Sequence, residues 1–63
     1  MTIERKRMNV IVHLTSDETG NTIRLYDGEH YERPIKTTTD HIIALIRNDK
    51  LLDDLVLEYI KRH

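Results

Sequence analysis

Residues 8–26, MNVIVHLTSDETGNTIRLY, decide the fold of this chain. The segment Met8–Thr15 alternates between an apolar face and a mixed face, which is typical of a half-buried strand. The loop Asp17–Gly20 ends in a glycine, which readily adopts the positive φ that hairpin loops require. The chain then folds back across this loop, which sets apolar residues opposite each other: Leu14 with Ile23 and Val12 with Leu25. The stretch therefore predicts a β-hairpin with one apolar face.

A third strand is expected over residues 30–36, after a turn built on Tyr26-Asp27-Gly28. We prefer a three-residue loop with a glycine bulge, because this register continues the apolar stripe. It gives three cross-strand pairs: Ile23 with Tyr31, Arg24 with His30 and Leu25 with Glu29. Pro34 cannot donate a hydrogen bond to a ladder, so the strand should be an edge or should break there.

Two short helices are expected after the strands. Thr38 or Thr39 can cap the first, and Asp40 favours the positive end of its dipole. Asn48 is expected in the left-handed conformation after the first helix, with Asp49 capping the second. The apolar faces are Ile42, Ile43, Leu45 and Ile46 in the first helix, and Leu52, Leu55, Val56, Tyr59 and Ile60 in the second.

These elements predict an α+β fold, a three-stranded antiparallel β-meander followed by two short α-helices packed on one sheet face. Residues 1–63 are expected to form a single domain, in which residues 1–7 are a flexible basic N-terminus. The expected core consists of Val10, Val12, Leu14, Ile23, Leu25, Leu45, Leu52, Leu55 and Tyr59.

The composition excludes several classes of protein. The chain has 63 residues, of which 38% are hydrophobic and 33% charged, and its formal net charge is −1. Cysteine is absent, which excludes disulfides and thiolate zinc sites. The longest apolar run, Ile42–Ile46, is far shorter than the roughly 20 residues of a membrane span. The start MTIERKRMNV lacks the apolar stretch of a signal peptide, so we expect a cytoplasmic protein.

No catalytic constellation is recognisable in the sequence. Ser16 is the only serine, and it lies on the shoulder of a hairpin among acidic neighbours. Gly20 and Gly28 are the only glycines, and neither belongs to a phosphate-binding loop. We therefore predict a protein that is not an enzyme and that needs no cofactor.

The four histidines do not predict a metal site. In the expected register His13 and His30 flank Arg24, whose positive charge repels a cation. His41 at a helix start and His63 at the terminus are expected at the surface.

The sheet face opposite the apolar stripe is the best candidate for a contact surface. Tyrosine and arginine are enriched among interface anchors, and this short chain has nothing left to cover them. The strand Met8–Thr15 is also expected to be an open edge, which favours pairing with a second copy. The candidate binding residues are Ile11, His13, Arg24, Tyr26, His30 and Leu57. A plain solvated face and a monomer are the simpler alternatives.

These observations favour a small accessory or regulatory protein that binds another protein, as a homodimer. Phages and other mobile elements encode many such chains, and this origin is an expectation from the size class alone. The alternative is a nucleic-acid-binding protein that uses the basic N-terminus and the open sheet face, through Arg5, Lys6, Arg7, Arg24 and Tyr26. The near-neutral charge and an acidic second helix favour the protein partner.

Overall fold

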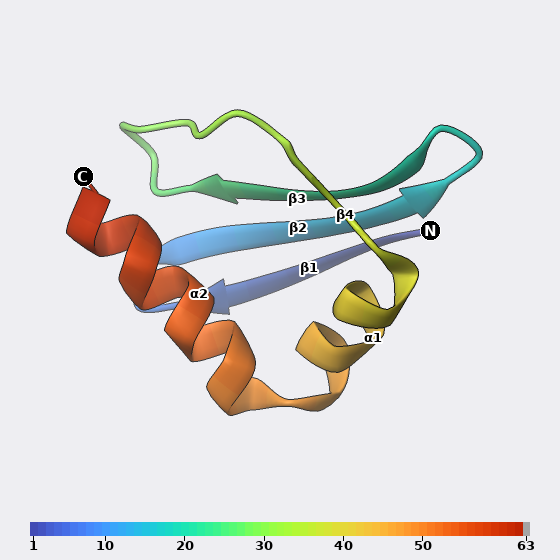
Figure 1. The fold of residues 1–63 in the computed structure, drawn as a ribbon. Helices are drawn as coiled ribbons and strands as arrows, with labels where there is room; N and C mark the ends of the chain where they lie inside the picture. Colours follow the sequence, from blue (N-terminus) through green and yellow to red (C-terminus); the bar gives the residue numbers. More distant parts are fainter. Residues whose placement is uncertain (63) are drawn as a thin grey trace.

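The computed structural model describes residues 1–62, so the expectation for His63 lies outside the described residues. An antiparallel sheet is followed by two helices (Figure 1). The sheet has four strands in the order β1-β2-β3-β4. The elements are β1 (Thr2–Arg7), β2 (Val10–Asp17), β3 (Gly20–Tyr26), β4 (Ile35–Thr37), α1 (Thr39–Arg47) and α2 (Asp49–Arg62). The α+β class is confirmed, and the predicted number of strands is one too low.

The central hairpin has the register that the sequence predicts. Leu14 pairs with Ile23 and Val12 pairs with Leu25. Gly20 has a φ of +123°, a conformation that residues with a Cβ rarely adopt. Apolar pairing and loop geometry therefore specify the same register for β2 and β3.

The additional strand is the basic N-terminus that we expected to be flexible. Thr2–Arg7 pairs antiparallel with β2, and Arg7 lies opposite Val10. The two residues between them, Met8 and Asn9, both have positive φ, at 50° and 65°. Two successive positive φ values are the signature of a tight hairpin turn with the natural strand twist. Because β1 covers β2, the open edge predicted for Met8–Thr15 does not exist.

The strand predicted over residues 30–36 is shorter and pairs in a different register. Only Ile35–Thr37 forms a strand, and Ile35 takes the place opposite Ile23 that we assigned to Tyr31. The predicted pairs of Arg24 with His30 and Leu25 with Glu29 are also wrong. Residues 27–34 form a loop instead, which contains one isolated bridge between Tyr26 and Tyr31.

The Asp27 side chain explains why regular strand pairing stops directly after β3. Asp27 Oδ1 accepts hydrogen bonds from the backbone N–H groups of Glu29, at 2.9 Å, and His30, at 2.7 Å. An Asp that binds the backbone two or three residues ahead builds a turn in place of a ladder. Pro34, which has no N–H, keeps the strand from forming until Ile35.

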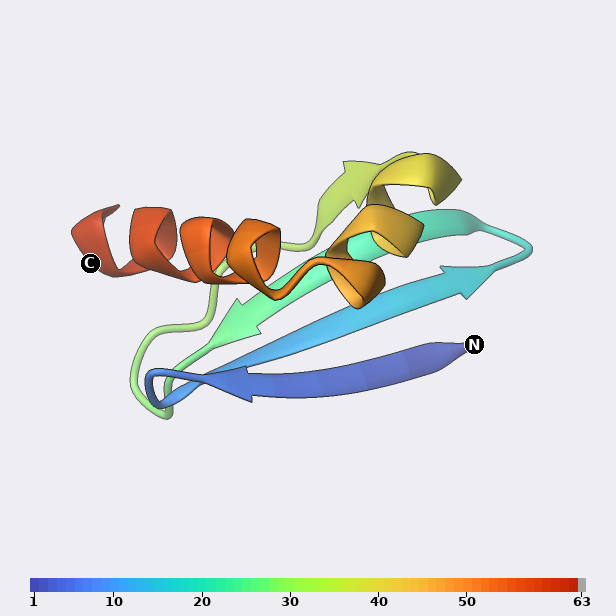
Figure 2. The same cartoon turned by 90° about the horizontal axis from the view of Figure 1, so that it is seen from below.

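Both helices lie on the same side of the sheet (Figure 2). Thr38 caps α1, because its Oγ1 accepts a hydrogen bond from the N–H of His41 at 3.1 Å. Asn48 is extended rather than left-handed, with a φ of −126°. Its Oδ1 accepts from the N–H groups of Lys50 and Leu51, so Asn48 caps α2 in place of the predicted Asp49.

The core lies between the helices and one face of the sheet. Its buried residues are Val10, Val12, Leu14, Ile23, Leu25, Ile42, Leu45, Leu52, Val56 and Tyr59. Eight of the nine predicted core residues are among them, and the ninth, Leu55, is half-buried and packs against the core. Ile43 and Ile60, which we placed on the inner helix faces, are exposed.

Candidate functional site

The face of the sheet that points away from the helices carries most of the predicted site. We call it the open face, and within residues 1–62 no helix covers it (Figure 2). Strand alternation and the observed pairing place one set of side chains on it. They are Thr2, Glu4 and Lys6 of β1, Ile11, His13, Thr15 and Asp17 of β2, Thr22, Arg24 and Tyr26 of β3, and Lys36 of β4.

Four of the predicted binding residues lie side by side on this face. Ile11 pairs with Tyr26, and His13 pairs with Arg24, as predicted. Lys6 pairs with Ile11 from the other side and extends this row. Neighbouring strands are about 4.8 Å apart, so the row from Lys6 to Tyr26 is continuous.

Tyr31, which we had placed on the inner face, joins the open face and completes its most ordered part. The rings of Tyr26 and Tyr31 lie 5.5 Å apart and are tilted by 56°. Arg24 Nη1 donates a hydrogen bond of 2.8 Å to Tyr31 Oη, and its guanidinium carbon lies 5.9 Å from the Tyr31 ring centre. Arg24, Tyr26 and Tyr31 are named the tyrosine cluster below. These contacts hold the three side chains together, and Tyr31 is 59% exposed, so the cluster is accessible.

The charges on the open face are mostly positive. Lys6, Arg24 and Lys36 are the cations of the strands, and Glu4 and Asp17 are the carboxylates. Glu4 Oε1 lies 3.3 Å from His13 Nε2, so the Glu4 carboxylate contacts the His13 ring on the same face. Asp17 Oδ1 accepts hydrogen bonds from Thr19 at the loop end of β2. Within residues 1–62, neither of these carboxylates forms an ion pair with Lys6, Arg24 or Lys36.

His30 does not belong to this face, which corrects the predicted row of His13, Arg24 and His30. It lies in the loop, where its backbone carbonyl accepts a hydrogen bond of 2.6 Å from Tyr59 Oη. Its Nδ1 lies 3.5 Å from Asp27 Oδ2. The loop turns its backbone toward α2 at residue 30 and returns to the sheet at Tyr31, so Tyr31 occupies the place predicted for His30.

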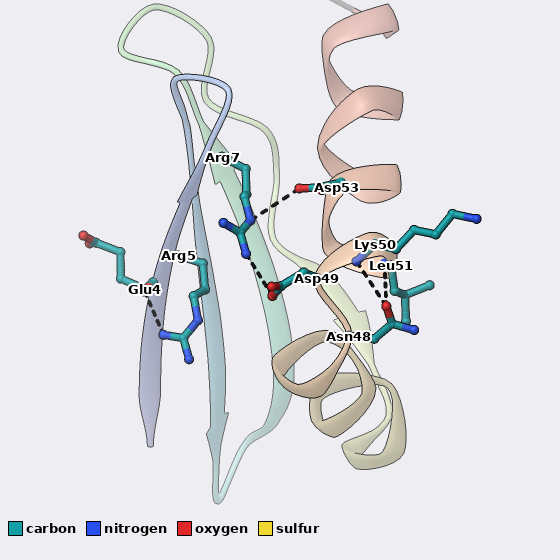
Figure 3. Close-up of polar contacts among 8 residues, drawn as sticks. All are labelled: Glu4, Arg5, Arg7, Asn48, Asp49, Lys50, Leu51 and Asp53. Carbon is teal, nitrogen blue, oxygen red and sulfur yellow. Dashed lines mark hydrogen bonds and ion pairs between the residues drawn. The ribbon is translucent and has the colours of Figure 1, made fainter.

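The three basic residues of the N-terminus are divided between the two faces. Arg7 forms ion pairs with α2, at 2.8 Å from Asp49 Oδ1 and 3.3 Å from Asp53 Oδ1 (Figure 3). Arg5 lies opposite Val12 and so shares the helix side of the sheet. Lys6 alone reaches the open face. Of the five residues predicted for nucleic-acid binding, Lys6, Arg24 and Tyr26 share the open face, whereas Arg5 and Arg7 lie on the other face.

Leu57 lies in the helical layer, on the opposite side of the molecule from the open face. It is 43% exposed and borders a groove of about 510 Å³ between α1 and α2. His41, Leu45, Leu51, Leu55 and Leu57 line this groove together with Asp54, Glu58 and Lys61. The predicted site thus divides into two separate surfaces.

Two interactions between α2 and the loop hold Tyr31 in position. Tyr59 Oη binds the His30 carbonyl, and burial raises the pKa of the Tyr59 phenol above its ordinary value. Arg62 Nη2 lies 2.6 Å from Glu32 Oε1, and this hydrogen bond is the main reason that the pKa of Arg62 is raised. The residues before and after Tyr31 are therefore fixed to the same helix.

Within residues 1–62 no three side chains among His, Cys, Asp and Glu gather as a candidate metal site. No helix in the same range is long and apolar enough to cross a membrane. The comparisons with known proteins found no matching family model, no matching curated protein and no matching solved structure.

Proposed function

We propose that this chain is an accessory or regulatory protein that binds an acidic surface of a larger protein through its open face. The observation that carries the proposal is the tyrosine cluster, an ordered and accessible group on the uncovered side of the sheet. Tyrosine and arginine dominate the binding energy of many interfaces, because they bury much area and lose little conformational freedom.

The cluster is organised before a partner arrives. Arg24 is held by Tyr31 Oη, and the two rings support each other at 5.5 Å. A guanidinium fixed in one orientation can still direct its other N–H groups to a carboxylate. Side chains that are already ordered lose less entropy on binding, which favours affinity.

The charges around the cluster favour a partner with carboxylates. Lys6 and Lys36 flank the cluster from the two outer strands, and Ile11 supplies apolar area beside Tyr26. Burial of that apolar area contributes roughly 25 cal/mol per Å². The positive charges accelerate association with an acidic surface and make it sensitive to salt.

The test is affinity capture from the native host, with nuclease treatment, using three forms of the tagged protein. The wild type is expected to retain a nuclease-resistant protein partner, and Arg24→Glu is expected to lose it. Arg47→Glu on α1 makes the same change of charge away from the open face and should retain the partner. If Arg24→Glu folds normally and captures the same partner as the wild type, the proposal is wrong.

Single-stranded nucleic acid is the second candidate, because two tyrosines flanked by cations also form a stacking platform for bases. Base stacking on an aromatic ring contributes about 1–3 kcal/mol per base. Arg7 is paired with Asp49 and Asp53, however, and Arg5 lies on the other face, which leaves few cations for phosphates. The protein partner is therefore favoured.

Labelled oligonucleotides titrated at physiological salt separate the two candidates. We expect no binding tighter than about 1 μM, because several phosphate contacts are needed for such affinity. Tighter binding with a steep salt dependence, lost in both Tyr26→Ala and Tyr31→Ala, would establish the nucleic-acid function instead.

A further inference from the structure

We propose that a second copy of this chain docks on the solvent side of α2, antiparallel to it, about a twofold axis near Leu57. This interface is separate from the open face and does not depend on the proposed function. It also replaces the dimer that we predicted through an exposed edge of β2, since β1 covers that edge. The new outer strand β1 exposes Glu4, Arg5 and Lys6, and such charges oppose pairing between edges.

A single stripe of α2 carries the interface. Lys50, Asp54, Leu57 and Lys61 follow each other at spacings of four, three and four residues, so they share one side of the helix. All four are exposed, and Figure 3 shows Lys50 pointing away from the sheet. We call these residues the α2 ridge. At its centre Leu57 is 43% exposed, and the groove with its apolar floor lies directly beside it.

When two copies of the α2 ridge lie antiparallel, opposite charges come together. When Leu57 faces Leu57 of the second copy, Asp54 lies three residues to one side and Lys61 four residues to the other. Along the helix axis, the distances from Leu57 to Asp54 and from Leu57 to Lys61 differ by one helical rise of about 1.5 Å. Each Asp54 therefore meets the Lys61 of the second copy. Two ion pairs then flank the leucine contact. A parallel arrangement would place like charges together, which opposes it.

Glu58 is the second carboxylate that lines the groove, and it lies four residues before Arg62 on α2. The pKa of Arg62 is raised first by its hydrogen bond to Glu32 and further by the charge of Glu58, which lies one turn away on α2. His41 and Lys61 are the basic groups that line the same groove. Asp54 forms no ion pair within the described residues 1–62, so its carboxylate can accept a cation from a second copy.

The groove gives Leu57 of the second copy an apolar place to enter. Leu51 and Leu55, both half-buried, and the buried Leu45 supply its apolar wall. Its volume of about 510 Å³ lies within the range of roughly 300–1,000 Å³ that is typical of binding clefts. The dimer buries the helical layers and leaves both open faces exposed on its outer sides. A partner with two acidic sites would then be bound with avidity.

Sedimentation equilibrium of the full chain up to about 1 mM tests this dimer. The wild type is expected to dimerise, and Leu57→Gln is expected to weaken dimerisation at least ~10-fold. Because Leu57 is exposed, the thermal midpoint of Leu57→Gln at low concentration should match that of the wild type. Ile43→Gln on α1 is the control, since Ile43 is 41% exposed and lies outside the groove lining. A wild type that remains monomeric at about 1 mM, or a Leu57→Gln protein that dimerises normally, overturns the proposal.

A charge exchange tests the orientation of the two helices. Asp54→Lys and Lys61→Asp should each weaken the dimer, because each creates a pair of like charges. The double variant restores both ion pairs and should dimerise within about threefold of the wild type. If the double variant is as weak as the single variants, the antiparallel arrangement is wrong. Arg24→Glu on the open face should leave dimerisation unchanged, so failure of this proposal is distinguishable from failure of the proposed function.

Discussion

The two faces of the sheet are built from the same strands, but one face is buried under the helices and the other is uncovered. Val12, Leu14 and Leu25 on one face are completely buried under the helices. Ile11 and Arg24, the immediate neighbours of Val12 and Leu25 in sequence, point to the open face. Alternation along a strand thus gives one chain a face that forms the core and a face that no helix within residues 1–62 covers. Two helices are sufficient to cover only one of them.

The loop of residues 27–34 connects these two faces. Its backbone is tied to α2 through the bond of Tyr59 to the His30 carbonyl and through the ion pair of Arg62 with Glu32. The same loop carries Tyr31 to the open face, where Arg24 binds it. The helical side of the sheet therefore positions Tyr31 on the open face. Four measurements test how independent the two faces are.

Leu25→Ala and Arg24→Ala, on adjacent residues of β3, should give the largest contrast. Loss of the buried Leu25 side chain should lower the free energy of unfolding by about 2–5 kcal/mol. Arg24→Ala should lower it by at most about 1 kcal/mol, because Arg24 is exposed. Urea denaturation measures both values. Equal losses would show that the open face contributes as much stability as the core.

Tyr59→Phe tests whether the helical side of the sheet positions Tyr31 on the open face. It leaves the His30 carbonyl without the phenol donor, which should lower the free energy of unfolding by about 1 kcal/mol. The loop should loosen, and the NMR signals of the Tyr31 ring should shift although residue 59 lies on the helical side. Tyr31→Phe removes the hydrogen bond from Arg24 at an exposed site and should cost less. An unchanged Tyr31 spectrum in Tyr59→Phe would show that α2 does not position the open face.

Arg7→Ala and Arg5→Ala compare two arginines of the same strand. Arg7 pairs with Asp49 and Asp53 of α2, so its loss should lower the free energy of unfolding by up to about 1 kcal/mol. Arg5 forms no ion pair within the described residues 1–62, and Arg5→Ala should be nearly neutral. Thermal unfolding of both variants at low and high salt measures the difference. Equal effects would mean that the ion pairs with α2 do not stabilise β1.

A fall in pH should have the smallest effect on stability, and it should act through Asp27 in the loop of residues 27–34. Hydrogen bonds from the N–H groups of His30 and Glu29 lower the pKa of Asp27 below its ordinary value of 3.8. A lowered carboxyl pKa stabilises the fold above 3.8, and this contribution is lost as the pH falls through the folded pKa. NMR titration of the Asp27 carboxyl measures the shift directly. Asp27→Asn does not titrate and should lose less stability in acid, whereas an Asp27 pKa at or above 3.8 would contradict the loop geometry.

Local patterns were enough to predict the central hairpin and the α+β class. Apolar alternation and the short loop before Gly20 both act between near neighbours, so the register of β2 and β3 followed from them. The strand β1 was missed because Ile3 is the only apolar residue in Thr2–Arg7, which gives no alternation to recognise. Its turn at Met8 and Asn9 also lacks the glycine that usually marks such hairpins.

The sequence by itself determined which side of β2 and β3 is buried, that Thr38 or Thr39 caps the first helix, and most of the core. Only the tertiary structure placed Tyr31 on the open face in the position predicted for His30. It also paired Arg7, predicted as part of the basic N-terminus, with Asp49 and Asp53. The physical reason is distance along the chain. Alternation and capping depend on residues a few positions apart, whereas the loop geometry depends on Tyr59 and Arg62, which lie about thirty positions later in the sequence.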